Sequence, residues 1–116
     1  MAKHDLETIR DRLRQFTAER EWGRFHSPKN LAMALSGEVG ELLEHFQWLT
    51  EAESADLPPE VLREVELELA DIFLYLVCIV DRLNVDLFDA ASRKIELNAK
   101  KYPADRVRGI AKKYTE

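Results

Sequence analysis

The chain has 116 residues, of which 46% are hydrophobic and 34% charged, with only four glycines and four prolines. This length fits one domain, and the composition excludes an intrinsically disordered chain and favours a helix-rich one. The net charge of −5 argues against nonspecific binding to nucleic acid or to an anionic membrane surface. A single cysteine, Cys78, excludes an internal disulfide, and with no apolar leader we expect a cytoplasmic protein.

The first half of the chain predicts two helices, because apolar residues recur there at helical spacing and no alternating strand pattern persists. The first helix is expected from about Asp5 to Trp22, where Gly23 can end it. The second is expected to begin at Ser27, which is followed by proline at the first helical position, and to continue to about Trp48. Residues 50–57 are expected to form a polar loop.

Two further helices complete a predicted all-α, four-helix bundle. One starts at the Pro58-Pro59 pair and reaches about Leu83, and the other is capped by Asp86 and reaches about Lys101. Residues 1–103 are therefore assigned to a helical domain, and residues 104–116 to a basic tail that is loosely ordered or lies over a neighbour. The apolar run at residues 72–80 is too short to span a membrane but needs cover on every side, for which subunit association is the simplest source.

Two pairs of carboxylates carry the strongest functional signal. Glu38 and Glu41 lie three positions apart in the second predicted helix, and Glu68 and Asp71 do so in the third. On a helix each pair projects from one face, so two packed helices would bring four carboxylates together. Mg²⁺, which prefers oxygen ligands, is the natural cation for such a cluster. Most isolated pairs of this kind are solvated, and pairing of Asp71 with Arg63 or Lys94 is the structural alternative.

Di-iron chemistry is a rival explanation for carboxylates in a helical bundle. Such sites usually carry a histidine three residues after a glutamate on two of the helices. No glutamate of this chain has a histidine at that position, since His45 follows Leu42 and His26 follows Gly23 by three residues. The pattern therefore favours an all-oxygen Mg²⁺ site.

Aromatic and basic residues extend the predicted site. Trp48 shares a helical stripe with Glu38 and Glu41, and Tyr75 follows Asp71 by one turn, so both could stack on a base beside the metal. The alternative is that these rings, and Phe25 above all, belong to the core. Lys94 and Asn98 fall one turn apart on the fourth predicted helix, as either a phosphate-binding edge or a solvated face.

These motifs together resemble the MazG-like, all-α nucleoside triphosphate pyrophosphohydrolases. The resemblance rests on residues 18–31, 37–42, 46–48, 68–72, 75–77 and 100–103, and extends to residues 112–115. It implies hydrolysis of a nucleoside triphosphate to the monophosphate and pyrophosphate by a homotetramer, with Mg²⁺ as cofactor and Mn²⁺ as a substitute. Within the family the chain is most similar to the branch that cleaves dCTP and modified dCTP; dUTP or phosphoribosyl-ATP as substrate, or a non-catalytic helical interaction module, are the alternatives.

The resemblance also implies individual roles. Glu38, Glu41, Glu68 and Asp71 would hold the metal, and Glu38 or Glu41 would activate the attacking water. The residues that would form the nucleotide pocket are Trp22, Gly23, Arg24, Phe25, His26, Trp48 and Tyr75. One departure is Leu13, which stands where relatives of the dCTP-cleaving branch can carry a histidine that contacts the substrate, and which therefore bears on the choice of base.

Overall fold

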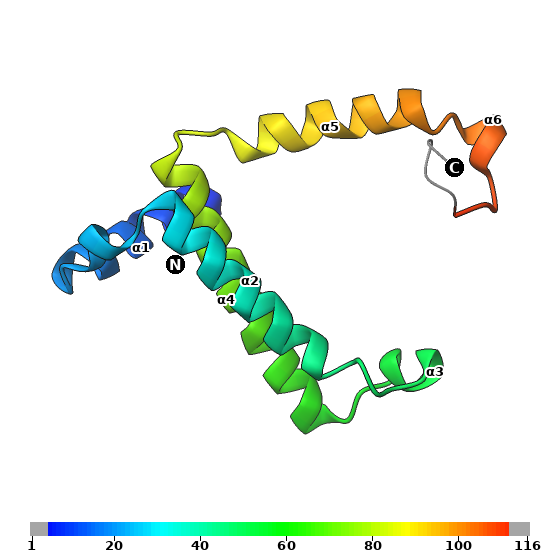
Figure 1. The fold of residues 1–116 in the computed structure, drawn as a ribbon, viewed down its shortest axis with the longest axis horizontal. Helices are drawn as coiled ribbons and strands as arrows, with labels where there is room; N and C mark the ends of the chain where they lie inside the picture. The colour runs from blue at the N-terminus through cyan, green and yellow to red at the C-terminus, as the bar shows by residue number, and fades with distance from the viewer. Residues whose placement is uncertain (1–4, 112–116) are drawn as a thin grey trace. The chain divides into compact units, whose positions relative to one another are not determined.

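The computed structural model describes residues 5–111, and all of the regular structure in that range is helical (Figure 1). The elements are, in chain order, α1 (Leu6–Glu19), the 3₁₀ helix η1 (Trp22–Phe25), α2 (Pro28–Glu44), α3 (Glu51–Ser54), α4 (Pro59–Arg82), α5 (Leu87–Lys101) and α6 (Ala104–Val107). The predicted all-α class is confirmed. Within the described range no helix is long and apolar enough to cross a membrane.

The helix starts follow local capping chemistry. The Ser27 hydroxyl accepts a hydrogen bond from the Asn30 backbone N–H at 3.1 Å, and Pro28 occupies the first helical position of α2. The Asp86 carboxylate accepts from the Asp89 backbone N–H at 3.1 Å at the start of α5. Both predicted caps are therefore confirmed.

The segment after α1 differs from the prediction. Helix α1 ends at Glu19, three residues before the expected end at Trp22, and Gly23 lies inside η1 instead of terminating a helix. The chain reverses at Glu21, which has a φ of 53° in the left-handed region that non-glycine residues seldom adopt. Because of this turn, the aromatic side chains of η1 do not continue the apolar face of α1. The spacing of apolar residues could not predict this change of direction.

The end of α2 also differs from the prediction. The helix ends at Glu44, and residues 45–49 form tight turns, so the expected single stripe from Glu38 to Trp48 is wrong at its distal end. The expected polar loop after it contains the short helix α3. Thr50 and Glu53 form a reciprocal capping box there, a signal that is readable in the sequence.

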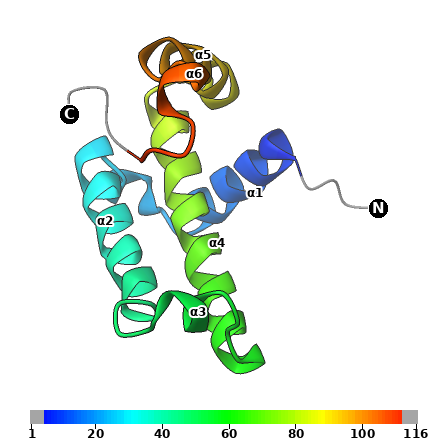
Figure 2. The same ribbon diagram turned by 90° about the vertical axis from the view of Figure 1, so that its right-hand side faces the viewer.

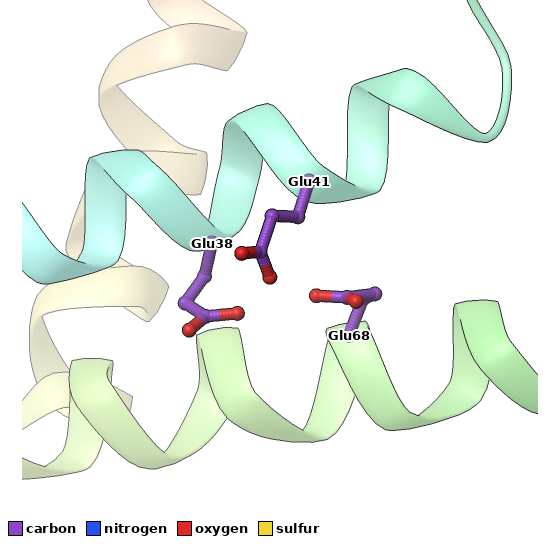
Figure 3. Close-up of side chains that lie close together, drawn as sticks. All are labelled: Glu38, Glu41 and Glu68. Atoms are coloured by element: carbon purple, nitrogen blue, oxygen red, sulfur yellow. The ribbon is translucent and has the colours of Figure 1, made fainter.

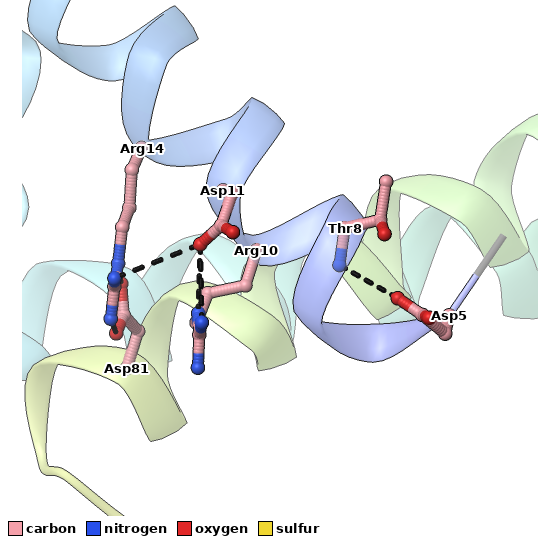
Figure 4. Close-up of polar contacts among 6 residues, drawn as sticks. All are labelled: Asp5, Thr8, Arg10, Asp11, Arg14 and Asp81. Atoms are coloured by element: carbon pink, nitrogen blue, oxygen red, sulfur yellow. Dashed lines mark hydrogen bonds and ion pairs between the residues drawn. The ribbon is translucent and has the colours of Figure 1, made fainter. Parts of the chain in front are cut away.

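The chain divides after Asn84 into two compact units. In the first, α2 and α4 lie side by side, and α1 packs on α4 (Figure 2). Leu31 of α2 and Val65 and Val77 of α4 are the fully buried apolar side chains of the described residues. The Arg14 guanidinium on α1 donates two hydrogen bonds to the Asp81 carboxylate of α4, and the Nε to Oδ2 distance is 2.8 Å (Figure 4).

The second unit begins at Val85 and carries α5 and α6. The expected loose order of the tail is wrong for Ala104–Val107, which form one helical turn after Pro103. Gly109 has a φ of 76°, a conformation that suits glycine. The predicted similarity at residues 112–115 lies outside the described residues, and the predicted domain boundary after Pro103 stays a prediction.

Candidate active site

Three of the four predicted metal ligands converge between α2 and α4. Glu38 and Glu41 project from α2 toward Glu68 on α4, and one carboxylate oxygen from each lies within 4.8 Å of the other two (Figure 3). The i, i+3 spacing puts both α2 carboxylates on one face, and the pairing of α2 with α4 supplies the third. The sequence predicted the face of each helix, while the packing of the two helices decides that the faces meet.

The electrostatics of this cluster are those of crowded negative charges. Burial, followed by the neighbouring carboxylates of Glu41 and Asp71, raises the pKa of Glu38 to about 7. Burial and the Glu41 carboxylate also raise the pKa of Glu68. Both shifts have the sign expected where desolvation and like charges oppose ionisation.

Two oxygens of the cluster are buried without a hydrogen-bond partner. They are Glu38 Oε2 and Glu68 Oε2. A buried acceptor without a donor is costly, and more so when it carries negative charge. A divalent cation that prefers oxygen would satisfy both atoms and cancel the repulsion, so this donor set fits Mg²⁺.

Asp71, the fourth predicted ligand, lies one turn from Glu68 but is not among the three residues whose oxygens converge. Its charge nevertheless raises the pKa values of Glu38 and Tyr75, which places it beside the cluster. Asp71 is exposed to solvent. Within residues 5–111 it forms no ion pair with Arg63.

A cavity of about 270 Å³ adjoins the carboxylates. Glu38 and Asp71 lie in its wall together with three predicted pocket residues, Trp22, His26 and Tyr75. Burial and the nearby carboxylates raise the pKa of Tyr75, so its phenol stays neutral and can donate a hydrogen bond. Tyr75 is the member of the predicted stacking pair that lies in this wall.

Trp22 is packed by its neighbours while one part stays open to solvent. Its ring makes edge-on contacts with Phe16, at 5.6 Å between centroids, and with His26, at 6.4 Å. Such contacts fix the orientation of a ring beyond what burial alone achieves. Because Trp22 is 44% exposed, it still has surface to offer a ligand in the cavity.

Other predicted pocket residues lie elsewhere. Gly23 lines a second cavity, of about 320 Å³. The lining residues that it shares with the first cavity are Leu13, Thr17, His26 and Cys78. Arg24 and Phe25 point to solvent with the guanidinium 4.9 Å above the ring, and the expectation of Phe25 as core is wrong because it is 55% exposed. Trp48 is 86% exposed and lines neither cavity, because α2 ends before it.

The two predicted phosphate contacts, Lys94 and Asn98, lie one turn apart on α5. Both side chains are exposed. Exposure is expected for a phosphate-binding edge and for a solvated helix face, so it does not decide between the two. They belong to the second compact unit, and their role stays a prediction.

Two residues of α1 belong to the part of the site that the sequence did not predict. Phe16 and Thr17 line the cavity beside the carboxylates, as does Leu74 of α4. Phe16 falls on the apolar stripe of α1 and so resembled an ordinary core residue. A second missed contact is His45, whose Nδ1 lies 3.8 Å from a Glu64 carboxylate oxygen at the far end of the cluster.

The helical fold agrees with the comparisons to known proteins. The MazG-like family model matches residues 33–116, and the chain belongs to that family. Among curated relatives it is 44% identical over 113 residues to dCTP pyrophosphatase 1 of Mus musculus and to that of Homo sapiens. Each alignment covers 96% of this chain but 66% of the relative, so the chain spans just under two thirds of these proteins.

A solved structure extends the comparison. A pyrophosphatase from Archaeoglobus fulgidus superposes with a TM-score of 0.77 at 41% sequence identity. The match covers 89% of this chain and 96% of the archaeal chain, so the helical architecture is shared over nearly the whole of that protein.

Proposed function

We propose that this protein is a Mg²⁺-dependent nucleoside triphosphate pyrophosphohydrolase that cleaves dCTP or a modified dCTP to the monophosphate and pyrophosphate. The observation that carries the proposal is the convergence of Glu38, Glu41 and Glu68, two of whose buried oxygens lack a partner, beside an aromatic cavity. The names of the dCTP pyrophosphatase relatives and of the archaeal pyrophosphatase support the reaction class.

The four predicted ligands would hold the metal, with Asp71 joining the three converged glutamates. Bound there, Mg²⁺ would neutralise charge on the phosphate oxygens of the substrate and on the leaving pyrophosphate. Mn²⁺, which also accepts oxygen ligands, is expected to substitute for it. Glu38 or Glu41 would orient the attacking water and accept its proton. The raised pKa of Glu38 favours proton acceptance by this carboxylate in the metal-free protein.

The remaining site residues would bind and orient the nucleotide. Trp22 and Tyr75 would contact the base or sugar in the cavity, and His26 would close its wall. Binding energy gained at these rings would align the α-phosphate with the water. Lys94 and Asn98 would hold the distal phosphates, and Trp48, with Gly23, Arg24 and Phe25, would complete the pocket around bound substrate.

We also propose that the working form is a homo-oligomer, with the tetramer as the expected state. Large apolar side chains on α2 and α4 are half or more exposed, among them Leu43, Leu67 and Leu69. Apolar surface of this extent marks a contact face, which further copies of the chain would cover.

The decisive experiment is a substrate panel. Pyrophosphate release is measured for the common ribo- and deoxynucleoside triphosphates, 5-methyl-dCTP and phosphoribosyl-ATP, each with Mg²⁺ and with excess chelator. Mg²⁺-dependent release with the highest kcat/KM for dCTP or 5-methyl-dCTP is expected. Preference for dUTP or phosphoribosyl-ATP would change the substrate, and no release from any compound would leave a non-catalytic helical module as the better explanation.

A further inference from the structure

The turn that carries Trp22 and His26 is held in place by side chains from two other helices. Arg82, in the last turn of α4, donates a hydrogen bond from Nη2 to the Gly23 carbonyl oxygen at 2.7 Å. Asn30 of α2 donates from Nδ2 to the Phe25 carbonyl oxygen at 3.0 Å. The backbone of η1 is thus fixed at its second and fourth residues by side chains from α4 and α2.

The turn needs such support because its own conformation is unfavourable. It is entered through Glu21 in the left-handed region, a strained conformation for a non-glycine residue that persists only where the surrounding structure imposes it. Four residues of 3₁₀ helix supply few hydrogen bonds of their own. External contacts therefore decide where η1 lies.

The Arg82 guanidinium can bond to η1 because the adjacent carboxylate, that of Asp81, is already paired with Arg14. The Asp81 carboxylate accepts hydrogen bonds from Nε and Nη2 of Arg14, and this ion pair keeps the pKa of Asp81 low. The guanidinium of Arg82 instead crosses to η1, and it lies so close that a Cβ added at Gly23 would be 3.2 Å from its Nη2. Gly23 leaves the space in which this contact forms.

The Gly23 carbonyl, which accepts the Arg82 hydrogen bond, lies in sequence between the two residues of this turn whose rings line the cavity. Trp22 precedes Gly23, His26 follows it by three residues, and the His26 backbone N–H donates to the same Gly23 oxygen at 3.1 Å. Both rings line the cavity that contains Glu38 and Asp71. A shift of the Gly23 carbonyl would therefore move both ring positions together.

We propose that Arg82 is a positioning residue, whose hydrogen bond to the Gly23 carbonyl fixes the Trp22 and His26 rings against the cavity beside the carboxylates. The proposal rests on the proposed function of that cavity. Arg82 lines the second cavity and not the one beside the carboxylates, so it acts through the turn.

The test compares Arg82→Gln and Arg82→Lys with Arg12→Gln, a control on an exposed arginine of α1 that lines neither cavity. Steady-state kinetics, thermal melting and helical content are measured for each full-length protein. Loss of a hydrogen bond from a charged donor is expected to raise KM about tenfold in Arg82→Gln, which corresponds to about 1.4 kcal/mol. Because the metal ligands are untouched, kcat should stay within about twofold, and Arg12→Gln should match the wild type.

A second readout follows the ring itself without substrate or metal. The chain has two tryptophans, so in a Trp48→Phe background the fluorescence reports Trp22 alone. Acrylamide quenching of Trp22 is expected to increase in Arg82→Gln and to stay unchanged in Arg12→Gln. Arg82→Lys keeps the positive charge and a hydrogen-bond donor, but its side chain is shorter. It should therefore raise KM by about threefold and also increase the quenching of Trp22.

The outcomes separate positioning from mere structural support. Unchanged quenching and KM in both Arg82 variants, or a lower melting temperature with unchanged KM, would overturn the proposal. Should Arg82→Gln lose helical content, the Lys variant decides by the same criteria. If the wild type releases no pyrophosphate, the proposed function fails, while the quenching data still decide whether Arg82 holds the turn.

Discussion

Replacing Glu68 by glutamine should stabilise the metal-free protein and at the same time weaken its response to Mg²⁺. The three glutamate carboxylates lie within 4.8 Å of one another. At that separation two unit charges repel by about 0.9 kcal/mol in the dielectric of water and by about 3.5 kcal/mol at an effective dielectric constant of about 20. Because Glu41 is exposed, the lower figure is the appropriate one.

Glu68→Gln removes two such repulsions and also the burial of one charged oxygen without a donor. At pH 8 the gain, counted from unit charges in the dielectric of water, is about 2 kcal/mol. For a chain of this size that corresponds to a rise in melting temperature of about 8 °C. Mg²⁺ at about 100 times its Kd stabilises the wild type by about 2.7 kcal/mol, and this gain should shrink in the variant because one ligand is lost.

The assay is thermal melting by circular dichroism at fixed protein concentration, in chelator and across a Mg²⁺ titration. Glu66→Gln, at an exposed position two residues away on α4, is the matched control and should behave like the wild type. A Glu68→Gln protein that is less stable than the wild type in chelator would refute the claim of crowded charges. An equal Mg²⁺ response in the two proteins would remove Glu68 from the metal site.

Four further outcomes are expected. Glu41→Gln and Asp71→Asn should each lower kcat at least ~100-fold with unchanged helical content, since charge stabilisation worth several kcal/mol is lost; full turnover in either variant would take that residue out of the site. The raised pKa of Glu38 means that the folded state binds more protons than the unfolded state between pH 4.5 and about 7. The stability of the metal-free protein should therefore fall as the pH rises through this window, while its Mg²⁺ affinity increases. Urea titrations at several pH values measure the stability, and calorimetry measures the affinity. Trp48→Ala should raise KM about 5- to 150-fold with little change in melting temperature, because the ring is 86% exposed and base stacking is worth roughly 1–3 kcal/mol; a large fall in melting temperature with unchanged KM would contradict this. Light scattering coupled to size exclusion should give a homo-oligomer, and a stable monomer at micromolar concentration would be evidence against it.

The sequence by itself determined the helical class and the chemistry of the acidic cluster. Ser27 and Asp86 predict the N-termini of two helices because a short polar side chain can accept a hydrogen bond from the free backbone N–H groups there. The i, i+3 spacing of Glu38 and Glu41 puts two carboxylates on one face whatever the surroundings. Such local rules depend on a few neighbouring residues, so they can be read without a structure. The capping box of Thr50 and Glu53 was equally local and was overlooked.

Only the tertiary structure decided which faces meet and which rings reach the site. Glu68 joins the α2 carboxylates because α4 packs along α2, a contact across some thirty residues that spacing alone cannot specify. Trp48 leaves the stripe of Glu38 because α2 ends at Glu44, and Trp22 enters the cavity wall because the chain reverses at Glu21 and Arg82 holds the turn that follows. The meeting of the carboxylates and the hydrogen bond from Arg82 to the turn depend on contacts between segments distant in sequence, which local preference does not specify.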